Sequence, residues 1–293
     1  MQSISFSSNK QTSQLNQKHS KKADPKVEVV SRAAGIATAW TVGLYGSYPV
    51  NVKLMKLMSE KNLELKENEV QKTVDAFKKA FQKSGLKDKV KILYFDKNTT
   101  FPGLPKDHLQ QLREGKNAFF ETISNTMLLP KNKLTLNWFH EMGHAINKNL
   151  GKVSKSLQTT RIPLMYASMI ACLSGGWRKS TPDEDGNLTP FQKAKNFTID
   201  NLGLLTLGLF APSVIEEYLA THKGEKLAKE FLPENLLKKA KVTSRLGFAT
   251  YVITGLTLAG GAVLGRTVTN KMREHLSSTM VPNLQPQQKS NEY

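Results

Sequence analysis

Two histidines that flank a glutamate are the residues of this sequence best suited to chemistry. His140-Glu141-Met142-Gly143-His144 fits the pattern H-E-x-x-H. On a helix, residues four apart lie on one face about one turn apart, so both imidazoles can reach a single ion. Glu141 projects about 100° away from His140 on the same turn and can reach a water on that ion rather than the ion itself. The pattern therefore predicts a metal site in which Glu141 acts on water.

The segment around this motif, Leu134–Asn147, has the pattern of a helix that is buried on one side. Apolar residues recur in it at helical spacing: Leu134, Phe139, Met142 and Ile146. Pro130 precedes the helix, and Gly151 suits its end. A glycine inside a helix costs about 1 kcal/mol relative to alanine. Gly143 therefore indicates that another segment passes close to the metal.

A third ligand is expected downstream, because a catalytic zinc usually has three protein ligands and one open position for water. The best candidates are Glu216 and Glu217, in the segment 211–221. Pro212 breaks the preceding apolar run, and Ser213-x-x-Glu216 fits a capping box at the start of a new helix. If Glu216 reaches back to that start, Glu217 is free to face the metal, which favours Glu217. The alternatives are that Glu216 is the ligand, or that both glutamates are solvated or complement the helix dipole.

These segments, in this order, resemble the gluzincin family of zinc metallopeptidases, in which a second helix supplies a glutamate to the H-E-x-x-H site. Glu217-Tyr218-Leu219-Ala220 is similar to the start of the second motif in the membrane-bound gluzincins, a group that includes the prenyl-protein peptidase and the bacterial heat-shock membrane protease. Those proteins also place hydrophobic segments between the two motifs. This sequence departs from the family at Thr221, where the family has an aspartate that holds a ligand histidine. A hydroxyl brings no charge, so that histidine should be less firmly polarised.

Together, the motif and the resemblance imply a zinc metallopeptidase that hydrolyses peptide bonds. The expected Zn²⁺ ligands are His140, His144 and Glu217. Zinc makes its bound water acidic and polarises the scissile carbonyl. Glu141 is then the general base, which later delivers the proton to the leaving amine. Tyr218 and His222 are candidates for stabilising the oxyanion, but nothing in the sequence fixes their geometry.

We expect an α+β fold that is mainly α-helical and zincin-like, with a small sheet beside the motif helix. Residues 63–84 have the apolar spacing of an amphipathic helix. Val90–Phe95 is rich in β-formers and predicts a strand, and residues 117–130 predict one or two more. Asn125–Leu129 is the candidate sheet edge to which an extended substrate adds as another strand. The alternative is a core strand that has no contact with substrate.

A single metallopeptidase domain is expected over residues 27–275. The tails at 1–26 and 276–293 are too polar to fold. The domain contains four apolar helices, at 33–50, 162–176, 202–215 and 246–265. The second and third of these predict a helical hairpin around a polar loop at 177–196, and the lysine-rich segment 223–245 predicts helix on both sides of Pro233.

The best candidate for a transmembrane helix is Leu246–Gly265, which carries no charge and lies between Arg245 and Arg266. The other apolar runs are short for spanning a bilayer, and each apolar helix has the alternative of being buried in a soluble core. We expect the protein at a membrane, integral or peripheral, with a peptide or protein as its substrate.

Composition narrows the choice of partners. The 293 residues carry a net charge of +18, which favours contact with anionic surfaces. The lysines are scattered, and no basic-aromatic motif is present, so we predict no nucleic-acid partner. Cys172 is the only cysteine, which excludes an intrachain disulfide.

The competing hypothesis is a non-catalytic, basic, membrane-associated interaction protein with a structural or degenerate zinc site. A structural site normally has a fourth protein ligand, and none is evident.

Overall fold

The computed structural model describes residues 24–131, 136–183 and 185–280. It is mainly helical and has a small sheet, as predicted. The helices are α1 (Pro25–Ala39), a π-helical segment (Trp40–Tyr45), α2 (Tyr48–Leu63), α3 (Glu67–Lys83), α4 (Lys106–Glu114), α5 (Asn137–Leu150), α6 (Lys152–Leu173), a 3-10 turn (Ser174–Gly176), α7 (Pro190–Asp200), α8 (Leu202–Phe231) and α9 (Glu234–Met280). The strands are β1 (Lys91–Phe95), β2 (Phe119–Glu121) and β3 (Thr126–Pro130).

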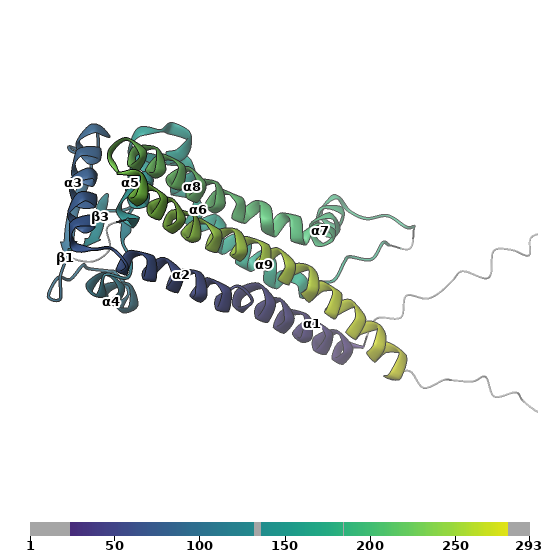
Figure 1. Cartoon of the computed structure of the whole chain (residues 1–293). Coiled ribbons are helices and arrows are strands. Elements are labelled where there is room, and N and C mark those ends of the chain that lie inside the picture. The colour runs from purple at the N-terminus through teal and green to yellow at the C-terminus, as the bar shows by residue number, and fades with distance from the viewer. Residues whose placement is uncertain (1–23, 132–135, 184, 281–293) are drawn as a thin grey trace, which may run out of the picture.

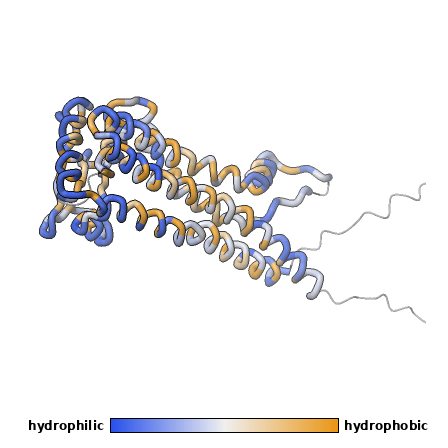
Figure 2. The backbone as a smooth tube through the Cα atoms, in the orientation of Figure 1, coloured by the Kyte–Doolittle hydropathy of each residue, from blue (hydrophilic) through white to orange (hydrophobic). Residues whose placement is uncertain are grey.

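The described residues form a long helical bundle with a smaller head at one end (Figure 1). Helices α1, α2, α6, α8 and α9 run side by side along the bundle, and α8 and α9 make its most extensive helix–helix contact. Helices α3 and α4 and the sheet form the head, where α5 begins. Figure 2 shows that hydrophobic residues follow the bundle helices, whereas the head is largely hydrophilic on its outside. Of the described helices, α8 and α9 are long and apolar enough to cross a membrane.

The sheet has the strand order β1-β3-β2. β1 pairs with β3 in parallel, and β2 pairs with β3 antiparallel. The prediction that Asn125–Leu129 forms a sheet edge is wrong, because β3 is the central strand. Every residue of β3 is buried, and a strand that is covered on both faces belongs inside the sheet. The edges are β1 and β2.

An aromatic cluster fixes the motif helix to the head. Phe77 of α3 lies edge-on to Trp138 and Phe139 of α5, with ring centroids 5.2 and 5.9 Å apart. All three side chains are buried. The predicted amphipathic helix at 63–84 corresponds to α3, whose apolar face makes these contacts. Leu134, which the sequence placed on the packed side of the motif helix, lies outside the described residues.

Two glycines bring α5 and α8 into backbone contact. A Cβ added to Gly143 would clash with the carbonyl of Ala220, and one added to Gly224 would clash with the carbonyl of Phe139. No larger residue fits at either position while the helices keep this spacing. The expectation that Gly143 admits a passing segment is confirmed, and the segment is α8.

Three predicted boundaries differ in the structure. Pro212 does not end a helix: α8 runs unbroken from Leu202, so 202–215 is only its first half. The expected loop at 177–196 contains the start of α7, because Thr189 and Gln192 form a capping box around Pro190. Helix α9 continues to Met280, past the expected start of the tail at 276, since the first proline comes only at position 282. Residues 1–23 and 281–293 of the predicted tails lie outside the described residues.

The backbone contact makes a prediction about Gly143→Ala. Alanine favours a helix by about 1 kcal/mol, but its Cβ has no room, so we expect a net loss of about 1–3 kcal/mol in the free energy of unfolding. The measurement is denaturant unfolding followed by circular dichroism, with a chelator present. Gly208→Ala is the matched control, because Gly208 of α8 has open space around it and should gain about 0.5–1 kcal/mol. Equal effects at the two positions would contradict the close approach.

Candidate metal centre

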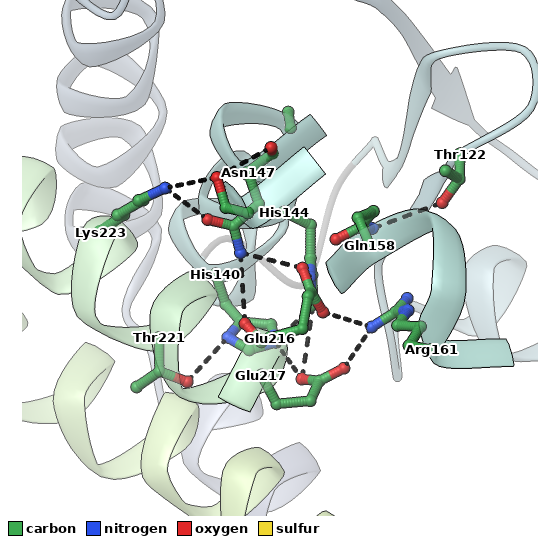
Figure 3. A network of polar contacts seen from close by, with 12 residues as sticks. Thr122, His140, His144, Asn147, Gln158, Arg161, Glu216, Glu217, Thr221 and Lys223 are labelled. Carbon is green, nitrogen blue, oxygen red and sulfur yellow. Dashed lines mark hydrogen bonds and ion pairs between the residues drawn. The ribbon is translucent and has the colours of Figure 1, made fainter. Parts of the chain in front are cut away.

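Three side chains from two helices converge below the backbone contact between α5 and α8 (Figure 3). His140 Nε2 and His144 Nε2 are 3.1 Å apart. Glu217 Oε2 lies 3.3 Å from His140 Nε2 and 3.5 Å from His144 Nε2. The structure thus brings together the three residues that the sequence nominated as ligands, and this group could hold a metal ion.

The spacing of these atoms fits a small tetrahedral cation. Zinc binds histidine nitrogen and carboxylate oxygen at about 2.0–2.2 Å, which places neighbouring tetrahedral ligand atoms about 3.3–3.5 Å apart. The three separations here fall at or close to that range. Glu217 is 1% exposed, and its Oε2 is buried without a hydrogen-bond partner among the described residues. A buried, unsatisfied carboxylate oxygen is costly, and a cation between the three atoms would satisfy it.

The outer nitrogen of each histidine is also held. His144 Nδ1 lies 2.9 Å from Glu216 Oε1, and His140 Nδ1 lies 3.3 Å from Thr221 Oγ1. Because a carboxylate only accepts hydrogen bonds, His144 must carry a proton on Nδ1. With Nδ1 held in this way, His144 turns its Nε2 toward Glu217. This is the orientation that a metal-ligating histidine needs.

Arg161 of α6 allows two adjacent carboxylates to be buried together. Its Nη1 donates to Glu216 Oε2 at 2.5 Å and to Glu217 Oε1 at 2.8 Å. Glu216 is fully buried and Arg161 is mostly buried. Without this guanidinium, the two negative charges would face each other in a medium of low dielectric constant. Arg161 also holds Glu217 by one oxygen, so the other points at the histidines.

Glu141 is buried beside the cluster and makes no hydrogen bond with the residues that the structure describes. Burial raises the pKa of Glu141 above its ordinary value, and the nearby histidines offset part of that rise. Burial alone would lower the pKa of His144, but the carboxylates of Glu216 and Glu217 raise it well above its ordinary value. The same negative potential favours a cation at His144 Nε2.

A cavity of about 430 Å³ opens onto the cluster. His140, Glu141, His144, Arg161 and Glu217 form the part of its polar wall that belongs to the cluster. Its apolar wall comes from α2, β2 and α9 and includes Leu54, Met58, Phe119, Phe120 and Leu246. The cavity can therefore hold a ligand with apolar groups next to the acidic and imidazole side chains.

The reason given for choosing Glu217 over Glu216 is wrong, although the geometry selects the same residue. Ser213 and Glu216 form no capping box, because α8 begins at Leu202 and Ser213 lies within it. Ser213 Oγ instead donates to the Arg161 carbonyl. Glu216 turns away from the helix start and contacts His144. Consecutive helix residues project about 100° apart, so the two glutamates reach opposite sides of the imidazole.

Sequence reasoning missed Arg161, Asn147 and Lys223 as parts of the site. Asn147 Nδ2 donates to Glu216 Oε1, and Lys223 Nζ donates to Asn147 Oδ1 (Figure 3). One feature of the sequence could have indicated a role for Arg161: it is the only charged residue between Lys155 and Arg178. Tyr218 and His222 stack on each other and line no part of the cavity.

Comparisons with known protein families, with curated proteins and with solved structures found no match for this chain.

The buried carboxylate pair makes a prediction about Arg161→Met. Removing one partner of a buried ion pair leaves uncompensated charge, so we expect a loss of about 3–5 kcal/mol in the free energy of unfolding. Unfolding is measured without metal, so that binding does not contribute. Arg245→Met is the control, because Arg245 is mostly exposed and its pair with Glu225 should contribute at most about 1 kcal/mol. A loss at position 161 no larger than at 245 would mean that the guanidinium does not balance the two glutamates.

Proposed function

We propose that this protein is a zinc-dependent metallopeptidase with a zincin-like arrangement of its motif helices. The observation that carries the proposal is the near-tetrahedral spacing of His140 Nε2, His144 Nε2 and the unsatisfied Glu217 Oε2. Two imidazoles and one carboxylate are a common ligand set of catalytic zinc. Among the described residues no fourth ligand joins this group, which leaves a position for water.

The remaining residues have the placement that hydrolysis requires. A bound zinc ion would supply a Lewis acid that polarises a carbonyl and acidifies water. Glu141 accepts and returns the proton, since its carboxylate is free of hydrogen bonds and faces the same cavity. Its raised pKa brings it closer to neutral pH, where a base that must also act as an acid works best.

The cavity wall supports a peptide as the substrate. Phe119 and Phe120 of β2 line the cavity, and β2 is an edge of the sheet. An extended peptide can add to such an edge through main-chain hydrogen bonds while its side chains enter the cavity. The strand that would pair with the peptide is therefore β2, and not β3 as the sequence indicated.

We further propose that the bundle is embedded in a membrane. The buried shares of the most apolar windows of α8 and α9 are only 33% and 22%, whereas the core helix of a soluble protein is mostly buried. Large apolar side chains are exposed all along the bundle, among them Trp40, Tyr48, Ile170, Leu204 and Leu256. An apolar surface of this extent marks an interaction site.

The uncharged stretches of α1–α2 and α9 lie side by side over much of their length, which supports a bilayer rather than a local docking site. Residues 33–52 and 246–265 each run for 20 residues without charge, or about 30 Å of helix, which matches the hydrocarbon core. They pack antiparallel: a Cβ on Gly35 would meet the Gly265 carbonyl, and Asn51 donates to Thr254. Lys179 and Arg266 both pair with Asp200 at one end of this layer. The metal cluster lies at the other end.

The peptidase proposal is tested by zinc content and peptide cleavage on one preparation. We expect about one zinc per chain, cleavage that Glu141→Gln abolishes without loss of zinc, and loss of zinc in Glu217→Ala. Glu225→Gln, on the same helix as Glu217, should change neither. Absence of zinc from the wild-type protein would overturn the proposal. Zinc in Glu141→Gln together with undiminished cleavage would show that Glu141 is not the base, and zinc in the wild-type protein without cleavage would favour the non-catalytic alternative.

The membrane proposal is tested with single cysteines in a Cys172→Ala background. Leu256 and Val242 are both well exposed on α9, at 58% and 46%, but Leu256 lies within the uncharged layer and Val242 outside it. In native vesicles we expect a water-soluble maleimide to label Leu256→Cys only after detergent is added. Val242→Cys should react before detergent in permeabilised vesicles. Equal labelling of both without detergent would show that water, and not lipid, covers the bundle.

A further inference from the structure

We infer that Glu216 is a positioning residue of the metal centre, which orients His144 and supplies the charge that Thr221 cannot supply. This inference rests on the proposed function, since it concerns how the zinc ligands are held. From the sequence, Glu216 was an alternative metal ligand or a helix-capping residue. In the structure its carboxylate lies neither among the ligand atoms nor at the start of a helix.

Both carboxylate oxygens of Glu216 accept hydrogen bonds from side chains that surround the ligands. Oε1 accepts from His144 Nδ1 at 2.9 Å and from Asn147 Nδ2 at 2.9 Å. Oε2 accepts from Arg161 at 2.5 Å. The carboxylate is fully buried and sits on the side of the imidazole opposite Glu217 (Figure 3). Glu216 is therefore held too firmly, and too far round the ring, to act as a ligand.

The two histidines are held unequally. His140 has a neutral hydroxyl at 3.3 Å, whereas His144 has an ionised acceptor at 2.9 Å. Hydrogen bonds to charged acceptors are about twice as strong as neutral ones, and they raise the basicity of the ligating nitrogen. The charged acceptor is thus Glu216, the residue before Glu217. Thr221, four residues after Glu217, supplies only a neutral hydroxyl.

Charge balance gives Glu216 a second role. Glu141, Glu216 and Glu217 bring three negative charges to the buried centre, and Arg161 brings one positive charge, a net of −2 with neutral histidines. A divalent cation neutralises this group. Without Glu216, the occupied centre would carry an uncompensated positive charge, which is costly in a buried site.

The test is the affinity for Zn²⁺ alone, measured by competition with a chromophoric chelator, together with the visible spectrum of the Co²⁺ form. We expect Glu216→Gln to weaken zinc binding about 10- to 100-fold and to alter the Co²⁺ spectrum, because His144 loses its charged acceptor. Thr221→Val should weaken binding by less than Glu216→Gln does. Glu225→Gln, which removes an arginine-paired carboxylate elsewhere on α8, should leave both readouts unchanged.

Folding is checked by thermal unfolding of each variant with chelator present. If Glu216→Gln destabilises the metal-free protein but keeps wild-type zinc affinity and the wild-type Co²⁺ spectrum, Glu216 is structural only and the inference is overturned. If Glu216→Gln does not fold, Glu216→Gln combined with Arg161→Gln removes the unmatched guanidinium and is measured in its place, against Arg161→Gln alone. A wild-type protein that binds no zinc would defeat the proposed function itself, whereas zinc in wild type with no effect of Glu216→Gln defeats this inference alone.

Discussion

The candidate site depends on backbone contact between α5 and α8. Glu217 of α8 brings its Oε2 within 3.3 and 3.5 Å of the two histidines of α5 only because the helix axes approach so closely. Gly143 and Gly224 make that approach possible, each at a point where a Cβ would strike a carbonyl of the other helix. Gly143 lies inside the motif itself, between the glutamate and the second histidine. Its cost to the helix is therefore offset by the contact that creates the candidate metal centre.

The close approach of α5 and α8 also buries two adjacent carboxylates that repel each other. A third helix, α6, supplies the positive charge that balances them. Glu216 and Glu217 are adjacent and buried, so neither can rely on water. Arg161 reaches both from α6, at the residue just before the apolar stretch 162–176 of that helix. The site therefore needs α5, α6 and α8 together, and the ligand glutamate is held by an arginine as well as by the proposed ion.

How much the sequence could predict depends on the range of the interaction concerned. The H-E-x-x-H spacing is local, so it predicted that His140 and His144 share a face, and the structure confirms this. The glycine in the motif predicted a close neighbour but not which segment supplies it. Glu217 was chosen for a capping reason that failed, because Pro212 lies inside a continuous helix and does not end one. The contacts of Glu216 with Arg161 and with His144 each join residues more than 50 positions apart. No local sequence pattern encodes such pairs. The order of the strands was missed for the same reason.

The position of the site in the bundle follows from the same charges. A group of three carboxylates and a guanidinium cannot face lipid, and here each points inward, among α5, α6, α8 and α9. The uncharged stretches of α6 and α8 on the far side of the site, 162–176 and 202–215, run for about 21–23 Å. A membrane that covered those stretches would therefore end near the level of Arg161 and Glu217, with the hydrophilic head in water. In that arrangement the cavity lies where an apolar wall from α2 and α9 meets the polar wall of the ligands. A peptide held by such a cavity would have its scissile bond near the membrane surface, because the ligands lie at the boundary and not at the midplane.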